Sequence, residues 1–142
     1  MKTSDAIHSL GQLVARILIG SMFLAAGIVR TRLQDFYFPY TTSVGLPAPE
    51  ITLPFAFLIE IAASILLIVG WKTRWAAWVL LFYTVILTVL FHAYAGPDDA
   101  QYLNQLSHVF KNLGVAGGLI YIAFYGAGSI SMDARSEKSR GR

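Results

Sequence analysis

The chain has 142 residues, a length typical of a single domain. Hydrophobic residues make up 56% of it, and its charged side chains are 11 Lys and Arg and 8 Asp and Glu. A soluble domain of this length would carry about 35 charged side chains. The composition therefore argues against an ordinary soluble enzyme, and also against intrinsic disorder, which needs low hydrophobicity. Because the net charge of +3 is small and scattered, no nucleic-acid partner is expected.

Four long apolar segments follow one another along the chain. Each has about 20 residues, enough for a helix to cross a hydrocarbon layer of roughly 30 Å. Because these segments lack the polar face of a soluble helix, a soluble bundle is not expected. The sequence thus predicts an all-α integral membrane protein, a four-transmembrane-helix antiparallel bundle that forms one domain over residues 1–142. The segments are Leu10–Val29, Ile51–Gly70, Trp75–Ala95 and Val109–Gly128.

The connections between the segments differ in character. Gly70–Arg74 is short enough to be a tight turn, which makes the second and third helices antiparallel neighbours. Gly96–Asp99 is a helix stop and turn signal, so we expect a loop up to residue 108. The aromatic side chains in Arg30–Glu50 suit a loop that lies among lipid headgroups. The tail from Ser131 is charged and is expected to fray.

The distribution of Lys and Arg predicts the orientation of the chain. Cytoplasmic loops of membrane proteins carry the excess of basic residues. The side that holds both termini and the 71–74 turn carries seven of them, and the opposite side carries three, so both termini are expected in the cytoplasm. The seven are Lys2, Lys72, Arg74, Arg135, Lys138, Arg140 and Arg142, and the three are Arg30, Arg32 and Lys111.

Four polar side chains fall near the outer ends of the predicted helices and form a candidate polar pocket: Glu60, His92, Lys111 and Asn112. An ionisable group within a membrane costs about 2.5–3.5 kcal/mol on insertion scales, so it needs a partner or a function. One interpretation is a pocket for a polar or redox-active small molecule. The other is internal neutralisation, in which Glu60 pairs with Lys111.

Two further charges lie toward the cytoplasmic ends and are interpreted as structural. Arg16 can extend its side chain toward the cytoplasmic surface or pair with Asp133, just beyond the fourth segment. Arg16 also begins a stripe on one face of the first helix, which continues through Gly20, Phe23, Gly27 and Arg30.

The residue types in the candidate pocket suit a quinone better than other cofactors. A quinone site needs an apolar slot, a hydrogen-bond donor and a proton acceptor, which Tyr, His, Lys and Glu side chains supply. A bis-histidine haem would need His92 and His108 at matching depth, but His108 falls in a predicted loop. With no cysteine and no metal-ligand spacing, no metal site is expected, and no catalytic residue is identified.

Several motifs, in this order, resemble the DoxX family. The turn Gly70–Ala77 is similar to that family's G-x-x-T-R-x-A-A motif, and Gly126–Asp133 is similar to its G-x-G-x-x-S-x-D ending. The other similar features are Arg16 followed by Gly20 and Phe23, the stretch Leu46–Pro49 leading to Glu60, and Lys111–Leu113 followed by Gly117 and Gly118. The similarity covers nearly the whole chain.

The resemblance implies a multi-pass protein of the bacterial inner membrane with four helices. Some members are described as subunits of thiosulfate:quinone oxidoreductase, and others as membrane parts of oxidoreductase complexes in thiol and oxidative-stress defence. The basic residue usual after the first helix corresponds to Arg30 or Arg32.

We therefore expect a membrane subunit associated with an oxidoreductase system, with quinone as its candidate cofactor. Its expected partners are membrane lipids and other membrane or peripheral protein subunits. Two alternatives stay open: a non-enzymatic scaffold or assembly protein, and a pathway for a small solute or for protons.

Overall fold

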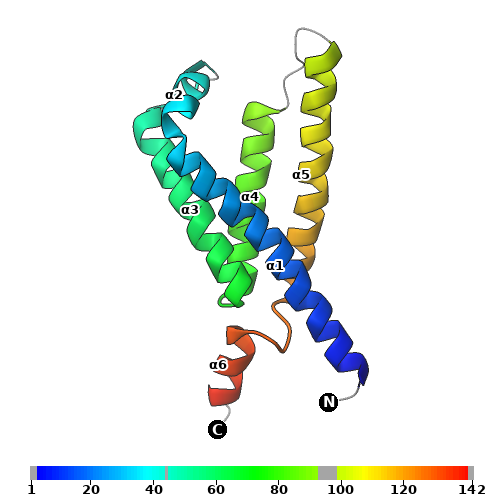
Figure 1. The fold of residues 1–142 in the computed structure, drawn as a ribbon. Helices are drawn as coiled ribbons and strands as arrows, with labels where there is room; N and C mark the ends of the chain where they lie inside the picture. The colour runs from blue at the N-terminus through cyan, green and yellow to red at the C-terminus, as the bar shows by residue number, and fades with distance from the viewer. Residues whose placement is uncertain (1–2, 44, 93–98, 141–142) are drawn as a thin grey trace.

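The computed structural model describes residues 3–43, 45–92 and 99–140, which form six helices (Figure 1). The prediction of an all-α protein is confirmed. The helices are α1 (Thr3–Arg32), α2 (Gln34–Ser43), α3 (Pro49–Val69), α4 (Thr73–Phe91), α5 (Asp99–Tyr125) and α6 (Met132–Arg140).

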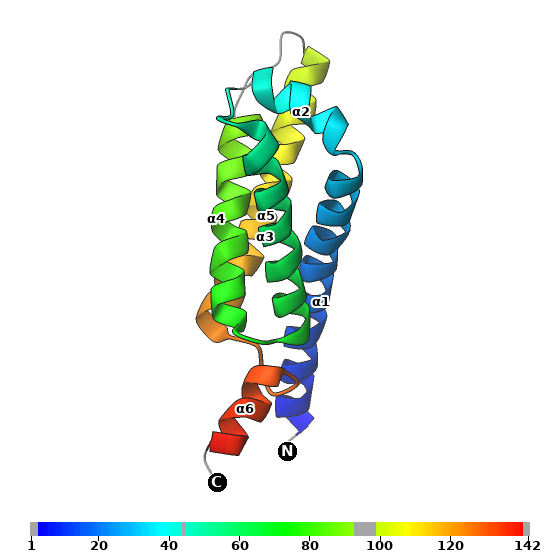
Figure 2. The same cartoon turned by 90° about the vertical axis from the view of Figure 1, so that its left-hand side faces the viewer.

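The four long helices α1, α3, α4 and α5 run in alternating directions between the two ends of the molecule (Figures 1 and 2). We call these the α2 end and the α6 end, after the short helix at each. Within the described ranges, three segments are long and apolar enough to cross a membrane: Asp5–Arg32, Pro49–Val69 and Thr73–Phe91. Helix α5 is not among them, because its first half is rich in polar residues.

Two predicted loops contain helix instead. The region expected to be a loop up to residue 108 is helical from Asp99, an acidic residue that favours the positive end of the α5 dipole. The long first connection contains α2, whose Tyr37 ring packs edge-on against Phe57 of α3 at a centroid distance of 6.3 Å. Aromatic packing on a neighbouring helix therefore stabilises helical structure in a segment that was predicted to be a loop among lipid headgroups.

Three predicted boundaries are also corrected. The third segment was expected to reach Ala95, but α4 ends at Phe91, and residues 93–98 lie outside the described ranges. The fourth was expected to reach Gly128, but α5 ends before Gly126, whose φ of 81° is left-handed. The tail forms α6 because the Ser131 hydroxyl accepts the Ala134 N–H, as an N-terminal cap does.

Close packing of α1 on α3 depends on two glycines of the α1 stripe. A Cβ at Gly20 would lie 2.5 Å from Cγ1 of Ile68, and a Cβ at Gly27 would lie 2.8 Å from Cγ1 of Ile61. Small residues at these positions let the two backbones approach, as they do between membrane helices generally. Helix α5 packs along α4 instead and makes few contacts with α1.

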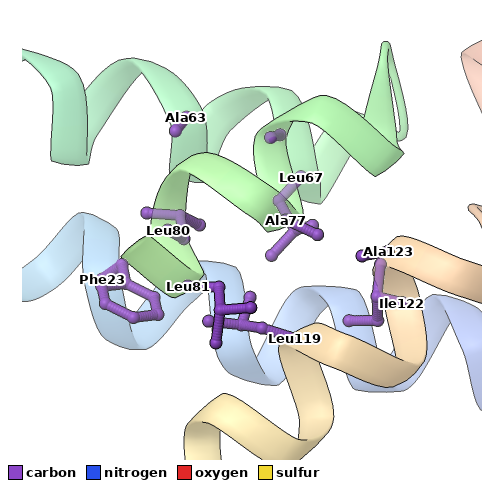
Figure 3. Close-up of a cluster of buried hydrophobic side chains, with 10 residues drawn as sticks. Phe23, Ala63, Leu67, Ala77, Leu80, Leu81, Leu119, Ile122 and Ala123 are labelled. Carbon is purple, nitrogen blue, oxygen red and sulfur yellow. The ribbon is translucent and has the colours of Figure 1, made fainter. Parts of the chain in front are cut away.

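The hydrophobic core joins these two helix pairs (Figure 3). Leu67, Ala77, Leu80 and Leu119 are completely buried in it. Its other members are Phe23, Ala63, Ala76, Leu81, Ile122 and Ala123.

At the α6 end, Arg16 connects three parts of the chain. Its side chain is completely buried, and Nη1 donates to the carbonyl oxygens of Leu67 and Ile68 at 3.3 and 3.1 Å. Nη2 donates to the carbonyl oxygen of Ile130 at 2.6 Å. Arg16 thus neither extends to the surface nor hydrogen-bonds the Asp133 carboxylate, because carbonyls at the end of α3 lack helical partners and accept its protons instead.

Asp133 caps α4 from another part of the chain. Its Oδ1 accepts the Lys72 N–H at 2.7 Å, and its Oδ2 accepts the Thr73 N–H at 3.0 Å. Partial burial raises the pKa of Asp133, but the N–H groups of Thr73 and Lys72 and the charge of Arg16 outweigh it, and the pKa falls below its usual value.

We expect Asp133→Ala to lower the free energy of unfolding in detergent by about 1–2 kcal/mol, because α4 loses its capping acceptor. A carboxylate with a lowered pKa stabilises the fold above its unfolded pKa of about 4, and this contribution disappears as the pH falls through the folded value. The difference between variant and parent should therefore be present at pH 7 and shrink below pH ~4.

The matched control is Glu137→Ala, at an exposed position of the same helix. It should change stability little at either pH. A difference between Asp133→Ala and its parent that persists at low pH would show that the charge of the carboxylate is not what stabilises α4.

Candidate functional site

A cavity of about 390 Å³ lies at the α2 end, between side chains of α1, α2, α3, α4 and α5. Its volume is within the range of roughly 300–1,000 Å³ that is usual for small-molecule sites. All four residues of the candidate polar pocket, Glu60, His92, Lys111 and Asn112, line it. Its apolar lining is Met22, Phe23, Ala26, Leu53, Ala56, Phe57, Leu87, Phe91 and Val115. Phe23 belongs to the hydrophobic core as well, so the cavity begins where the core ends.

Glu60 is the most deeply buried charge in the cavity wall. It is completely buried, and its Oε1 lies 2.5 Å from Nη1 of Arg30, whose side chain is 30% exposed. Its Oε2 accepts a hydrogen bond of 3.0 Å from the Tyr83 hydroxyl. Through this carboxylate the structure connects α1, α3 and α4.

The predicted pairing of Glu60 with Lys111 is therefore wrong. Glu60 forms its ion pair with Arg30, because α1 packs directly against α3 where Gly27 leaves space: a Cβ at Gly27 would lie 3.4 Å from Oε2 of Glu60. The arrangement also distinguishes the two basic residues after the first helix. Arg30 faces the cavity, whereas Arg32 is exposed.

The histidines form the opposite wall of the cavity. His92 is the C-cap of α4, and its Nδ1 lies 2.7 Å from Oε1 of Gln105 on α5. Its ring stacks on that of His108, with centroids 4.6 Å apart and planes 11° apart. Nδ1 of His108 lies 3.0 Å from Nζ of Lys111. The stacking leaves no space for a haem between the two rings.

Asn112 joins the same wall to α4. Its amide nitrogen donates to the Thr88 hydroxyl at 2.8 Å, and that hydroxyl donates in turn to the carbonyl oxygen of Thr84. The amide oxygen of Asn112 takes no part in these bonds. Thr88 of α4 thus supports a residue of the cavity wall.

The sequence did not indicate every polar residue that lines the cavity. Arg30 was recognisable, because it shares a helix face with Arg16 and Gly27. His108 was missed because its segment was predicted to be a loop. Tyr37 and Thr41 were missed because α2 was not predicted, and Tyr83 carried no signal beyond its position beside Thr84.

In chemical terms, the cavity combines apolar walls with a few fixed polar atoms. Within residues 3–43, 45–92 and 99–140, no group of three or more His, Asp or Glu side chains is placed to hold a metal ion. The polar atoms of the cavity wall are hydrogen-bond donors and acceptors, together with the charges of Arg30, Glu60 and Lys111.

Comparison with known proteins places this geometry in a family. The family model described as DoxX matches residues 11–93, more than half of the chain. The chain belongs to the DoxX family. The match extends from α1 to just beyond His92, and so contains Arg30, Glu60 and Tyr83 but not Lys111 or Asn112.

Two curated relatives cover almost the whole DoxX-family chain. It is 31% identical to inner membrane protein YphA of Escherichia coli strain K12, over 87% of this chain and 88% of the relative. It is 30% identical to inner membrane protein YqjF of the same organism, over 89% and 92%. Solved structures give no match. Together with the apolar helices, these relatives confirm that this is a multi-pass inner-membrane protein.

We expect Arg30 and Glu60 to be energetically coupled. Arg30→Met leaves a buried carboxylate without a counter-charge, and should lower the free energy of unfolding by about 3 kcal/mol. Glu60→Gln should lower it less, because Arg30 keeps access to water. The double variant should be more stable than the sum of the two losses implies, by at least about 1 kcal/mol.

The measurement is thermal and denaturant unfolding of all three variants in the same detergent. Arg32→Met is the matched control, since Arg32 is exposed and lies two residues nearer the end of α1, and it should change stability by less than about 0.5 kcal/mol. Strictly additive effects of the two single substitutions would contradict the coupling.

Proposed function

We propose that this DoxX-family protein spans the inner membrane four times and binds a quinone-type ligand in the cavity, as the membrane subunit of an oxidoreductase system. The observation that carries the proposal is the composition of the cavity. Polar side chains from five helices converge at one end of an otherwise apolar bundle. Apolar sites with a few fixed polar groups are typical of small-molecule binding.

The chemistry of a quinone fits these groups. Its ring and tail are apolar, and its ring oxygens need hydrogen-bond donors. The Lys111 ammonium and a ring N–H of His108 offer such donors, while the buried Glu60 carboxylate is already occupied by Arg30 and Tyr83. Because the chain has no cysteine, we assign the associated redox chemistry to a partner subunit.

We further propose that α5 is the fourth span and that the α6 end faces the cytoplasm. Helix α5 runs alongside α4 for most of its length, and its second half is apolar. The exposed side chains of Trp71 and Trp75 lie at the α6 end, where Trp suits the membrane interface. The basic residues Lys72, Arg74, Arg135, Lys138 and Arg140 lie at the same end and are exposed. The cavity then opens toward the outer half of the membrane.

A pair of substitutions separates ligand binding from folding. We expect His92→Phe to preserve the melting temperature and to weaken binding of decylubiquinol at least about fivefold. The hydroxyl groups of this reduced form need a hydrogen-bond acceptor, and Phe fills the space of His92 without offering one. Asp133→Ala, at the other end of the bundle, should lower the melting temperature and leave the affinity unchanged. Affinity and melting temperature are measured on the same purified samples.

The proposal fails if the parent protein binds no quinone analogue. The alternative, a non-enzymatic scaffold, would then be preferred. One observation favours it: the Glu60 carboxylate has both oxygens satisfied within the protein, so the bundle needs no ligand to neutralise its most buried charge.

Single cysteines test the orientation. Asp99→Cys at the start of α5 should react with a membrane-impermeant maleimide in intact cells, whereas Ser139→Cys in α6 should react only after the cells are opened. The chain has no cysteine of its own, so each label reports one site. Labelling of position 139 in intact cells, with protection of position 99, would reverse the assignment.

A further inference from the structure

The neighbours of the two stacked histidines define different tautomers for them. Oε1 of Gln105 only accepts hydrogen bonds, so Nδ1 of His92, 2.7 Å away, carries a proton. The Lys111 ammonium only donates, so Nδ1 of His108, 3.0 Å away, carries none. The positive charge of Lys111 also opposes a second proton on the His108 ring.

In a neutral imidazole, the state of one nitrogen determines the state of the other. Nε2 of His92 is therefore a hydrogen-bond acceptor, whereas Nε2 of His108 carries a proton and is a donor. Neither atom is used in a hydrogen bond among the residues that the structure describes. Both rings line the cavity and stack on one another, so an acceptor nitrogen and a donor nitrogen belong to the same part of its lining.

We propose that His92 and His108 form a donor–acceptor pair that determines which protonation states of a ligand headgroup the cavity binds. His92 accepts the hydroxyl hydrogen of the reduced, quinol-type form. His108 donates to the ring oxygen of the oxidised, quinone-type form. This inference rests on the proposed function, and it concerns recognition of both members of a redox pair, with no transfer of protons or electrons between the ligand and the rings.

The pair explains a feature that a scaffold would not need. If the two histidines served only to join α4 to α5, nothing would require one Nε2 atom to be a donor and the other an acceptor. Here Gln105 and Lys111 act on the two Nδ1 atoms in opposite senses, so the two rings, both in the cavity lining, carry opposite hydrogen-bonding atoms at Nε2. Gln105 and Lys111 are positioning residues in this scheme, and the two histidines are the specificity-determining ones.

Asparagine and glutamine substitutions test the two ring nitrogens separately. Asn places its amide near the position of Nδ1 and nothing near that of Nε2, so His92→Asn keeps a donor for Gln105 and His108→Asn keeps an acceptor for Lys111. Gln instead returns a polar atom near the position of Nε2. Ser107→Ala is the control, at an exposed position next to His108 whose hydroxyl bonds within its own helix.

The experiment measures the affinity of the purified full chain for decylubiquinone and, without oxygen, for decylubiquinol. His92→Asn should weaken quinol binding about fivefold and leave quinone binding within about twofold of the parent, since one hydrogen bond to one form is lost. His108→Asn should show the opposite pattern. The two Gln variants should recover most of the lost affinity, and Ser107→Ala should resemble the parent for both forms.

The other outcomes separate a failure of the donor–acceptor pair from a failure of the proposed function. If the parent binds the analogues but both Asn variants weaken the two forms equally, the donor–acceptor pair is wrong and the proposed ligand class survives. The same conclusion follows if neither Asn variant changes either affinity. If the parent binds neither form, the proposed function fails and this inference fails with it. Melting temperatures show whether each variant is folded, and the Gln variants replace any Asn variant that is not.

Discussion

The ion pair between Arg30 and Glu60 is the interaction on which the α2 end of the molecule depends. Glu60 is completely buried within an apolar bundle, where an unpaired carboxylate would be strongly destabilising. Arg30 supplies the counter-charge and Tyr83 the second hydrogen bond, so three helices meet at one carboxylate. This network holds α1, α3 and α4 at their relative positions on one side of the cavity. The hydrophobic core does not extend into this space and cannot hold the helices there.

The two ends of the bundle solve the same problem of buried polarity in opposite ways. At the α6 end, Arg16 and Asp133 bind main-chain groups of the α3–α4 turn and of the α5–α6 connection, and the core fills the space between the helices. At the α2 end, the polar side chains bind one another around unfilled space. The packed end fixes the helix directions, and this allows the other end to stay hollow without loss of the fold.

Hydrophobicity alone was enough to predict the long helices, the membrane and the tight turn after Gly70. It could not predict α2 or the first turns of α5, because these depend on Tyr37 packing against Phe57 and on the contacts that Gln105 and His108 make with His92 at the end of α4. The residues of the candidate pocket were indicated by their depth, and the structure places all four at one cavity. Depth could not give the partner of Glu60, because that choice depends on the close approach of α1 to α3 at Gly27.

The remaining charge of the cavity, the Lys111 ammonium, bears on the choice between a ligand-binding site and a closed scaffold. The Glu60 carboxylate is neutralised by Arg30, which leaves the Lys111 ammonium without a carboxylate partner among the described residues. Its neighbour is a neutral imidazole, so the cavity keeps an excess of one positive charge beside two histidines. Lys111 is an exposed residue, so its ammonium can be solvated without a carboxylate partner. A ligand with an electron-rich oxygen would accept a hydrogen bond from this ammonium, so the ligand-binding proposal gives Lys111 a role that the scaffold alternative does not require.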